Sequence, residues 1–196
     1  MKFPSLGAAF GFAALLSACA HPMVISPDIV HIVPDSSTKP IPKNVGFYIS
    51  EDKRALEVTT PGGGGDKVSY HPYADTETAF YKMLSNVFLN VTVLKTANDS
   101  EALGRGQLSF IIIPDFRADS SSSGIATWMA TDFSFEITCS VRTLDGTQVA
   151  VESATGHGKA ELGELIKDFS LSGKRAAEDA LLKTQRALLG DAKLRN

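Results

Sequence analysis

The stretch FSFEITCSV at residues 133–141 decides how this chain folds. Every second residue in it is apolar and the residues between are polar; the apolar set is Phe133, Phe135, Ile137, Cys139 and Val141. Alternation with a period of two predicts a β-strand that buries one face and exposes the other. We expect one long strand over residues 125–143, with its apolar side at the odd positions.

The segments on either side of this stretch predict two neighbouring strands. Asp145-Gly146 follows it, and both residues tolerate the positive φ angles of a tight hairpin turn. Residues 148–159 then return as the next strand. An earlier strand is predicted by the alternating apolar residues Leu108, Phe110, Ile112 and Phe116. The three segments together predict an antiparallel meander.

Shorter patterns complete the predicted domain. Further strands are expected at residues 45–50, 56–60 and 90–94. Apolar residues at helical spacing predict helices over residues 75–89 and 172–189. These elements predict an α+β fold: a mainly antiparallel sheet with a three-strand meander and two helices packed on one face.

The chain opens with a short apolar stretch. Lys2 provides a positive charge, and residues 6–16 carry none, which is the pattern of a secretory signal. Residues 6–18 amount to 13 positions. A membrane-spanning helix needs about 20 apolar residues, so we do not expect a transmembrane anchor here. The stretch ends in Leu16-Ser17-Ala18-Cys19.

This tetrapeptide resembles the lipobox of bacterial lipoproteins. The resemblance implies that residues 1–18 are a lipoprotein signal peptide, removed by cleavage before Cys19. It also implies that Cys19 carries acyl chains such as palmitate, which anchor the protein to a membrane. Ala20, in place of an aspartate, implies export to the outer membrane. The alternative is an ordinary signal peptide whose cleavage site contains a cysteine.

Composition then divides the rest of the chain. Residues 19–43 contain five of the nine prolines and are predicted to be the lipidated cysteine and a semi-rigid tether. The apolar run at 29–33 is either a docked edge segment or one that waits for a partner, and we expect docking. A single α+β domain is predicted over residues 44–190, with a polar tail at 191–196.

Charge and cysteine content exclude several classes of function. The formal net charge is −3 at pH 7 and the lysines and arginines are scattered, so no nucleic-acid partner is expected. If Cys19 is acylated, Cys139 has no disulfide partner in the chain. Its place in the alternating strand predicts a small buried hydrophobe. A reactive thiol is the alternative.

The sequence contains no recognisable catalytic or metal-binding motif. The four histidines lack the spacing of a zinc site, so no metal or cofactor is predicted. Asp115, Arg117 and Asp119 share one strand face, and Asp132 and Glu136 share another. We expect these acids to belong to a solvent-exposed sheet face. Paired carboxylates can also act as a general acid and base or bind calcium. If the strands pair, Arg117 could neutralise one acid across the sheet.

Five residues are candidates for contact with a partner. Trp128 has an even number, so on the predicted strand its side chain points away from the core-facing odd-numbered residues. It either forms an exposed contact or packs under the terminal helix or the tether. Leu182 and Leu189 form either the flank of a wide buried face or a second contact ridge. Tyr70 and Tyr73 follow the glycine run at 62–65 and could belong to a contact loop.

The architecture looks like the accessory lipoproteins of Gram-negative outer membranes, which assist lipopolysaccharide export, curli secretion or peptidoglycan synthases. No functional residue carries over from that resemblance. The missing catalytic motifs, the predicted tether and the candidate contacts Trp128, Leu182 and Leu189 favour a periplasm-facing, non-enzymatic interaction or assembly subunit of an envelope complex. One alternative is a lipid- or glycan-binding module with a pocket lined by Phe110, Phe133 and Phe135. A second is a hydrolase, for which His157 near Asp115 is the pair to check.

Overall fold

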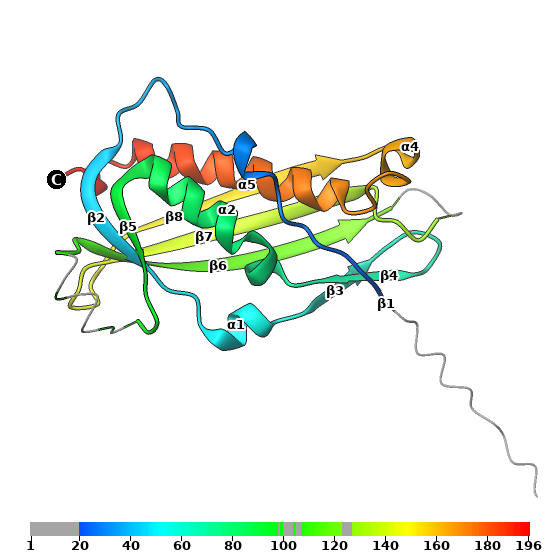
Figure 1. Ribbon diagram of the computed structural model, residues 1–196, viewed down its shortest axis with the longest axis horizontal. Coiled ribbons are helices and arrows are strands. Elements are labelled where there is room, and N and C mark those ends of the chain that lie inside the picture. Colours follow the sequence, from blue (N-terminus) through cyan, green and yellow to red (C-terminus); the bar gives the residue numbers. More distant parts are fainter. Residues whose placement is uncertain (1–19, 98, 100–103, 105–106, 123–126) are drawn as a thin grey trace, which may run out of the picture.

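The computed structural model describes residues 20–196 except for 98, 100–103, 105–106 and 123–126 (Figure 1). Its larger sheet has five strands in the order β5-β2-β6-β7-β8. Their bounds are β2 (Ile41–Phe47), β5 (Phe88–Val93), β6 (Phe110–Ser121), β7 (Asp132–Arg142) and β8 (Gln148–Lys159). A smaller sheet has the order β1-β4-β3, with β1 (Ala20–Pro22), β3 (Val58–Pro61) and β4 (Lys67–Tyr70).

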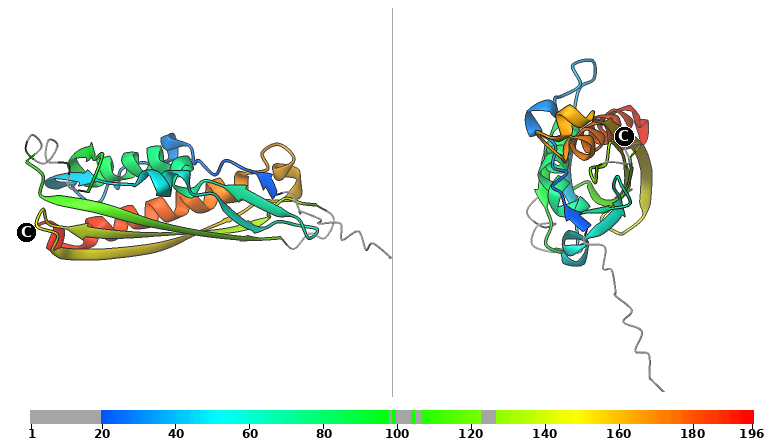
Figure 2. Two further views of the ribbon diagram at one scale, coloured as in Figure 1. Left: turned by 90° about the horizontal axis from the view of Figure 1, so that it is seen from below. Right: turned by 90° about the vertical axis from the view of Figure 1, so that its right-hand side faces the viewer.

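Two long helices cover one face of the larger sheet. They are α2 (Pro72–Val87) and α5 (Leu171–Gly190), and Figure 2 shows both on the same side of the strands. The shorter helical segments are α1 (Glu51–Ala55), α4 (Leu162–Leu165) and the 3-10 turns η1 (Ile29–His31) and η2 (Ala192–Leu194). No helix within the described ranges is both long enough and apolar enough to cross a membrane.

The predicted α+β class and the meander are confirmed. β6 pairs with β7 and β7 with β8 in antiparallel register, and these ladders contain most of the paired residues. β2 instead runs parallel to both of its neighbours. The parallel pairing with β5 follows from the intervening helix α2, because a parallel neighbour needs a crossover connection rather than a hairpin.

The core lies between the helices and the odd-numbered face of β7. Its aromatic residues form a connected group: the ring of Phe116 stacks on Tyr73 at 4.7 Å between centroids and meets Phe80 edge-on at 5.4 Å. Phe135 contacts the same ring at 5.6 Å. Cys139 is fully buried in this core, and burial raises the pKa of its thiol to about 12. The prediction of a small buried hydrophobe at this position is therefore confirmed.

Helix α5 lies unusually close to β8 because two residues of that strand are glycines. A Cβ atom at Gly156 would collide with the backbone of Ala176 and Ala180, and one at Gly158 with the backbone of Ser172 and Ala176. Side chains of α5 also reach the free edge of β8. The Nζ of Lys183 donates to the carbonyl of Thr155 at 3.0 Å, and the amide of His157 donates to Asp179 at 3.0 Å. These bonds satisfy backbone groups that an edge strand would otherwise expose.

The predicted tether is packed against the domain rather than extended from it. Residues 20–40, here called the strap, begin as β1 paired with β4 and then cross the outer side of α2 and α5 (Figure 1). Met23, Ile25 and Ile32 of the strap are buried in the core. The prolines suggested a free linker, but the burial of these three side chains, together with the pairing of β1 and the hydrogen bonds from α2 and α5, offsets the entropy cost of ordering the segment. The predicted boundary at residue 44 is therefore moved to the start of the described chain.

Two buried amides hold the middle of the strap. The Nδ2 of Asn86, on α2, donates to the carbonyl of Ile32 at 3.0 Å, and the Nε2 of Gln185, on α5, donates to the carbonyl of Val33 at 2.9 Å. The Asn86 amide also donates to the Gln185 Oε1 at 2.9 Å. The strap is thus fixed to both helices at one point.

The predicted polar tail also packs on the fold. Leu194, in η2, is fully buried. The guanidinium of Arg195 donates to the carbonyls of Lys39 and Leu189, each at 3.0 Å. The C-terminal residues therefore fasten the end of the strap to the end of α5, because one apolar side chain in the tail finds a place in the core.

Candidate functional site

Tyr70 and Tyr73 are not available to a partner, contrary to the sequence-based expectation. Each side chain is only 1% exposed. The Tyr73 hydroxyl donates to the Asp115 Oδ1 at 3.1 Å and accepts the amide of Phe116 at 3.0 Å. Burial raises the pKa of Tyr70 to about 12. β4 and the first turn of α2 direct both rings into the core, a local geometry that the glycine run before them does not reveal.

Leu182 and Leu189, predicted as either the flank of a buried face or a contact ridge, differ in their exposure. Leu189 is buried in the core, which agrees with the flank of a wide buried face. Leu182 is half-buried and borders a surface hollow that is also lined by Val33, Gln185 and Arg186. Leu182 is therefore the member of the pair that can contact a partner.

Trp128 joins three segments at one end of the molecule. Its half-buried ring stacks on His21 of β1, with centroids 4.2 Å apart and planes 20° apart, and lies 5.5 Å from the ring of Phe169. Its carbonyl accepts the amide of Gly63, in the turn between β3 and β4, at 2.9 Å. This end, with β1, that turn and α4, is called the anchor end, because Ala20 directly follows Cys19 in the chain. The predicted signal peptide and Cys19 lie outside the described residues.

The face of the larger sheet opposite the helices carries the predicted acids. Arg117 stands directly across from Glu136 in the β6–β7 ladder, and its Nε lies 3.5 Å from the Asp115 Oδ2. Asp115 also binds the Nζ of Lys53 at 2.9 Å and so ties α1 to β6. Another predicted acid, Asp132, forms an ion pair with Lys159 at 3.0 Å. Asp115 and Asp132 are thus paired with neighbouring cations, as expected for a solvated face.

The hydrolase pair suggested by the sequence is not assembled. His157 stands opposite Ser134, whereas Asp115 stands opposite Thr138, two rows further along the sheet. The pairing instead places Asp119, Ser134 and His157 in one row that lines a shallow hollow. Sequence reasoning missed this row because its members come from three strands.

The row lacks the contacts of a catalytic triad. Among the side chains that the structure describes, none of the hydrogen bonds joins Ser134 to His157 or His157 to Asp119. A nucleophile, its base and the acid that orients the base need such bonds. The Asp119 Oδ1 accepts the amide of Ser120 at 2.8 Å instead. Over the described ranges, no group of three or more histidine, cysteine, aspartate or glutamate residues is arranged to hold a metal ion.

The residues suggested to line a pocket for an apolar or glycan ligand are core residues in the structure. Phe110, Phe133 and Phe135 are all buried and belong to the same packed core as the two helices. Two of the rings contact other aromatic residues: Phe133 meets Tyr70 at 5.1 Å and Phe135 meets Phe116 at 5.6 Å between centroids. These side chains therefore build the core of the domain.

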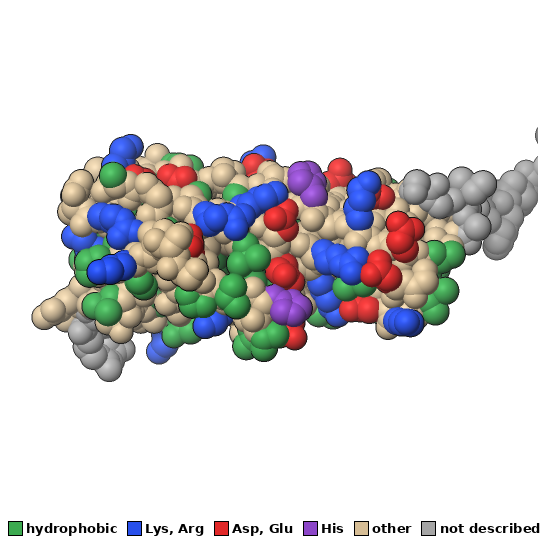
Figure 3. All heavy atoms as spheres, turned by 90° about the horizontal axis from the view of Figure 1, so that it is seen from above, with side chains coloured by type: hydrophobic (Ala, Val, Ile, Leu, Met, Phe, Trp, Pro, Cys, Tyr) green, Lys and Arg blue, Asp and Glu red, His purple; other side chains and the backbone are tan. Residues whose placement is uncertain are grey.

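Exposed aliphatic residues gather on the strap. Val30 is 67% exposed, and Ile29 and Val33 are also exposed, whereas Ile32 between them is buried. The strap surface is defined here as Ile29, Val30, Val33 and the neighbouring Leu182. Figure 3, which views this side of the molecule, shows hydrophobic side chains among charged ones. The apolar run at 29–33 was expected either to dock on the domain or to stay free for a partner. In the structure Ile32 is buried against the domain, and Ile29, Val30 and Val33 are exposed.

Comparisons with known proteins give no family. No family model and no curated protein matches the sequence. Two solved structures resemble the fold at a distance. Protein XCC0632 from Xanthomonas campestris, of the family DUF330, is 11% identical over 88% of this chain and 93% of its own, with a TM-score of 0.44. A "putative lipoprotein" from Caulobacter crescentus CB15 is 14% identical over 47% of this chain and 75% of its own, with a TM-score of 0.29. Neither likeness assigns a role to any residue here.

Proposed function

We propose that this chain is an outer-membrane-anchored periplasmic lipoprotein that acts as a non-enzymatic interaction or assembly subunit of an envelope complex. Its lipobox-like tetrapeptide supports the anchor. The strap surface supports a protein contact, and it is the observation on which this proposal depends. Three branched aliphatic side chains project from a segment whose backbone is held by Asn86 and Gln185.

A surface of this kind suits a stable partner. Exposed apolar side chains that lie together on a soluble domain mark contact sites, whereas single ones are ordinary. The strap is already ordered by its hydrogen bonds and by the burial of Ile32. Binding there costs little additional conformational entropy, which favours affinity. Leu182 extends the apolar area onto α5.

The open sheet face supports the non-enzymatic part of the proposal. The Asp119–Ser134–His157 row has the residue types of a hydrolase without the hydrogen bonds that would activate its serine. The acids beside it are paired with Lys53, Arg117 and Lys159. A fixed, charge-compensated face is suited to solvation rather than to acid–base chemistry.

Substitution of Val30 by aspartate tests the contact. We expect Val30→Asp to reduce the envelope protein recovered with this chain from mildly crosslinked membranes by about tenfold, because a charge in an apolar contact is costly. Recovery is measured by quantitative mass spectrometry at native expression. Val151→Asp is the matched control, since Val151 is 46% exposed on β8. Equal recovery from wild type and Val30→Asp, or recovery of the bait alone from wild type, would contradict the proposal.

A further inference from the structure

A second group of exposed apolar side chains lies at the anchor end. Ile166 is 71% exposed, the highest value among the large hydrophobic residues described, and Leu162 and Phe169 are exposed as well. Leu162 opens α4 and Ile166 caps it four positions later, so the helical turn places these two on one side, and Phe169 follows just beyond the helix. Leu165, on the other side of that turn, is fully buried. The turn is therefore amphipathic, with an apolar side that faces solvent.

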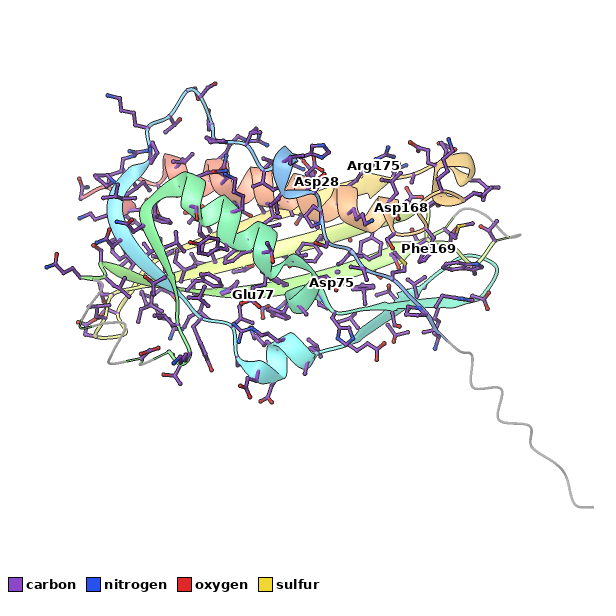
Figure 4. All side chains as sticks on the ribbon, in the orientation of Figure 1. Asp28, Asp75, Glu77, Asp168, Phe169 and Arg175 are labelled. Atoms are coloured by element: carbon purple, nitrogen blue, oxygen red, sulfur yellow. The ribbon has the colours of Figure 1, made fainter. Side chains whose placement is uncertain are left out.

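The turn is held rigidly in this orientation. Arg175 of α5 donates two hydrogen bonds to the carboxylate of Glu164, at 2.8 and 3.1 Å, and a third to the carbonyl of Lys159 at 2.6 Å. Lys174 binds Asp168 at 2.8 Å. Figure 4 shows Arg175, Asp168 and Phe169 together on this side of the molecule. The exposed apolar residues are thus presented by a braced segment.

The same residues connect directly to the point where the chain leads to Cys19. Phe169 contacts Trp128, and Trp128 stacks on His21, the second residue of β1. Ala20 is already paired with Lys67, so no free linker separates Cys19 from the folded domain. Adjacent Cα atoms are about 3.8 Å apart. Acyl chains on Cys19 would therefore start at the surface of the anchor end.

We infer that the anchor patch, defined as Leu162, Ile166, Phe169 and Trp128, lies in the headgroup region of the bilayer that holds those acyl chains. This inference rests on the lipid anchor in the proposed function. Amphipathic segments bury their apolar side about 5–10 Å into that region, and tryptophan is enriched there. The occupant is a lipid surface rather than a protein because the anchor brings this end, and no other, to the membrane.

Membrane contact at the anchor patch fixes the orientation of the domain. The molecule is elongated, and β1 and α4 lie toward one tip (Figure 2). With that tip on the bilayer, the sheet and α5 extend into the periplasm. The strap surface then stands clear of the lipid, where a protein partner can reach it.

Trp128 is the single tryptophan of the chain, so its fluorescence reports on this patch alone. The probe is the lipidated protein in vesicles of phosphatidylethanolamine and phosphatidylglycerol with brominated acyl chains, which quench tryptophan on contact. We expect strong quenching in wild type and about half as much with Ile166→Asp, because a charge lifts the turn from the interface. Leu89→Asp, on β5 away from the patch, is expected to quench like wild type; Leu89 is 64% exposed.

Flotation of the same vesicles tests the lipid anchor separately from membrane contact at the anchor patch. Protein that floats with the lipid but shows no quenching of Trp128 would overturn the membrane contact and leave the anchor standing. Equal losses of quenching with Ile166→Asp and Leu89→Asp would also overturn it. Wild-type protein that fails to float would contradict the lipid anchor and the contact together.

Discussion

Replacement of Gly156 by valine is expected to lower the free energy of unfolding by about 3 kcal/mol or more. The new Cβ atom would fall inside contact distance of the Ala176 carbonyl oxygen and the Ala180 nitrogen, and only 2.8 Å from the Ala180 Cα. Backbone atoms of a helix cannot rotate away as a side chain can. Helix α5 would have to lift from β8 and open the core along that strand.

Urea denaturation followed by circular dichroism measures this change. Gly190→Ala is the matched control, because a Cβ there meets nothing within 4 Å. It is expected to change the free energy of unfolding by less than about 0.5 kcal/mol. Similar stabilities for wild type and Gly156→Val would show that α5 does not lie as close to β8 as described. Gly158→Ala should resemble Gly156→Val, since its Cβ meets the Ser172 carbonyl.

Truncation of Ile32 to alanine is the second large expected effect, at about 3 kcal/mol of destabilisation. Ile32 is the fully buried residue in the middle of the strap, and its carbonyl accepts a hydrogen bond from Asn86. The substitution leaves a cavity and loosens the backbone contacts at the same point. A free tether would show no such effect, so the measurement separates a packed strap from a linker.

Val30→Ala serves as the control for this prediction, because Val30 is mostly exposed on the same segment. It is expected to cost less than about 0.5 kcal/mol. Both variants are compared by urea denaturation. If Ile32→Ala and Val30→Ala unfold at the same urea concentration as wild type, the strap does not contribute to the core.

The central sheet could be predicted because its signals are local. Alternation along residues 133–141 and the Asp145-Gly146 turn together specify two strands and their connection, and the predicted strand at 148–159 has the bounds of β8. The parallel neighbours of β2 were not predicted. Parallel pairing depends on where a crossover helix returns the chain, which hydrophobic periodicity does not encode.

The packing of the strap could not be predicted from the sequence. Proline content predicted a linker, but the groups that hold it, Asn86 and Gln185, lie 54 and 152 residues from the carbonyls they bind. Such separations leave no local trace. The same holds for Trp128, whose partners His21 and Phe169 come from distant segments, and for the anchor patch, whose short apolar turn resembles any helix start in sequence.

A photo-crosslinking residue in place of Val30, in cells, tests the proposed function most directly. We expect a crosslink to an envelope protein in the chain that retains Cys19, and loss of that crosslink with Cys19→Ala, because the lipid places the strap surface beside its partner. The same residue in place of Val151 should give no specific product. A Val30 crosslink that persists without Cys19 would contradict the role of the anchor. No crosslink from Val30 in either strain would contradict the strap surface as the site of contact.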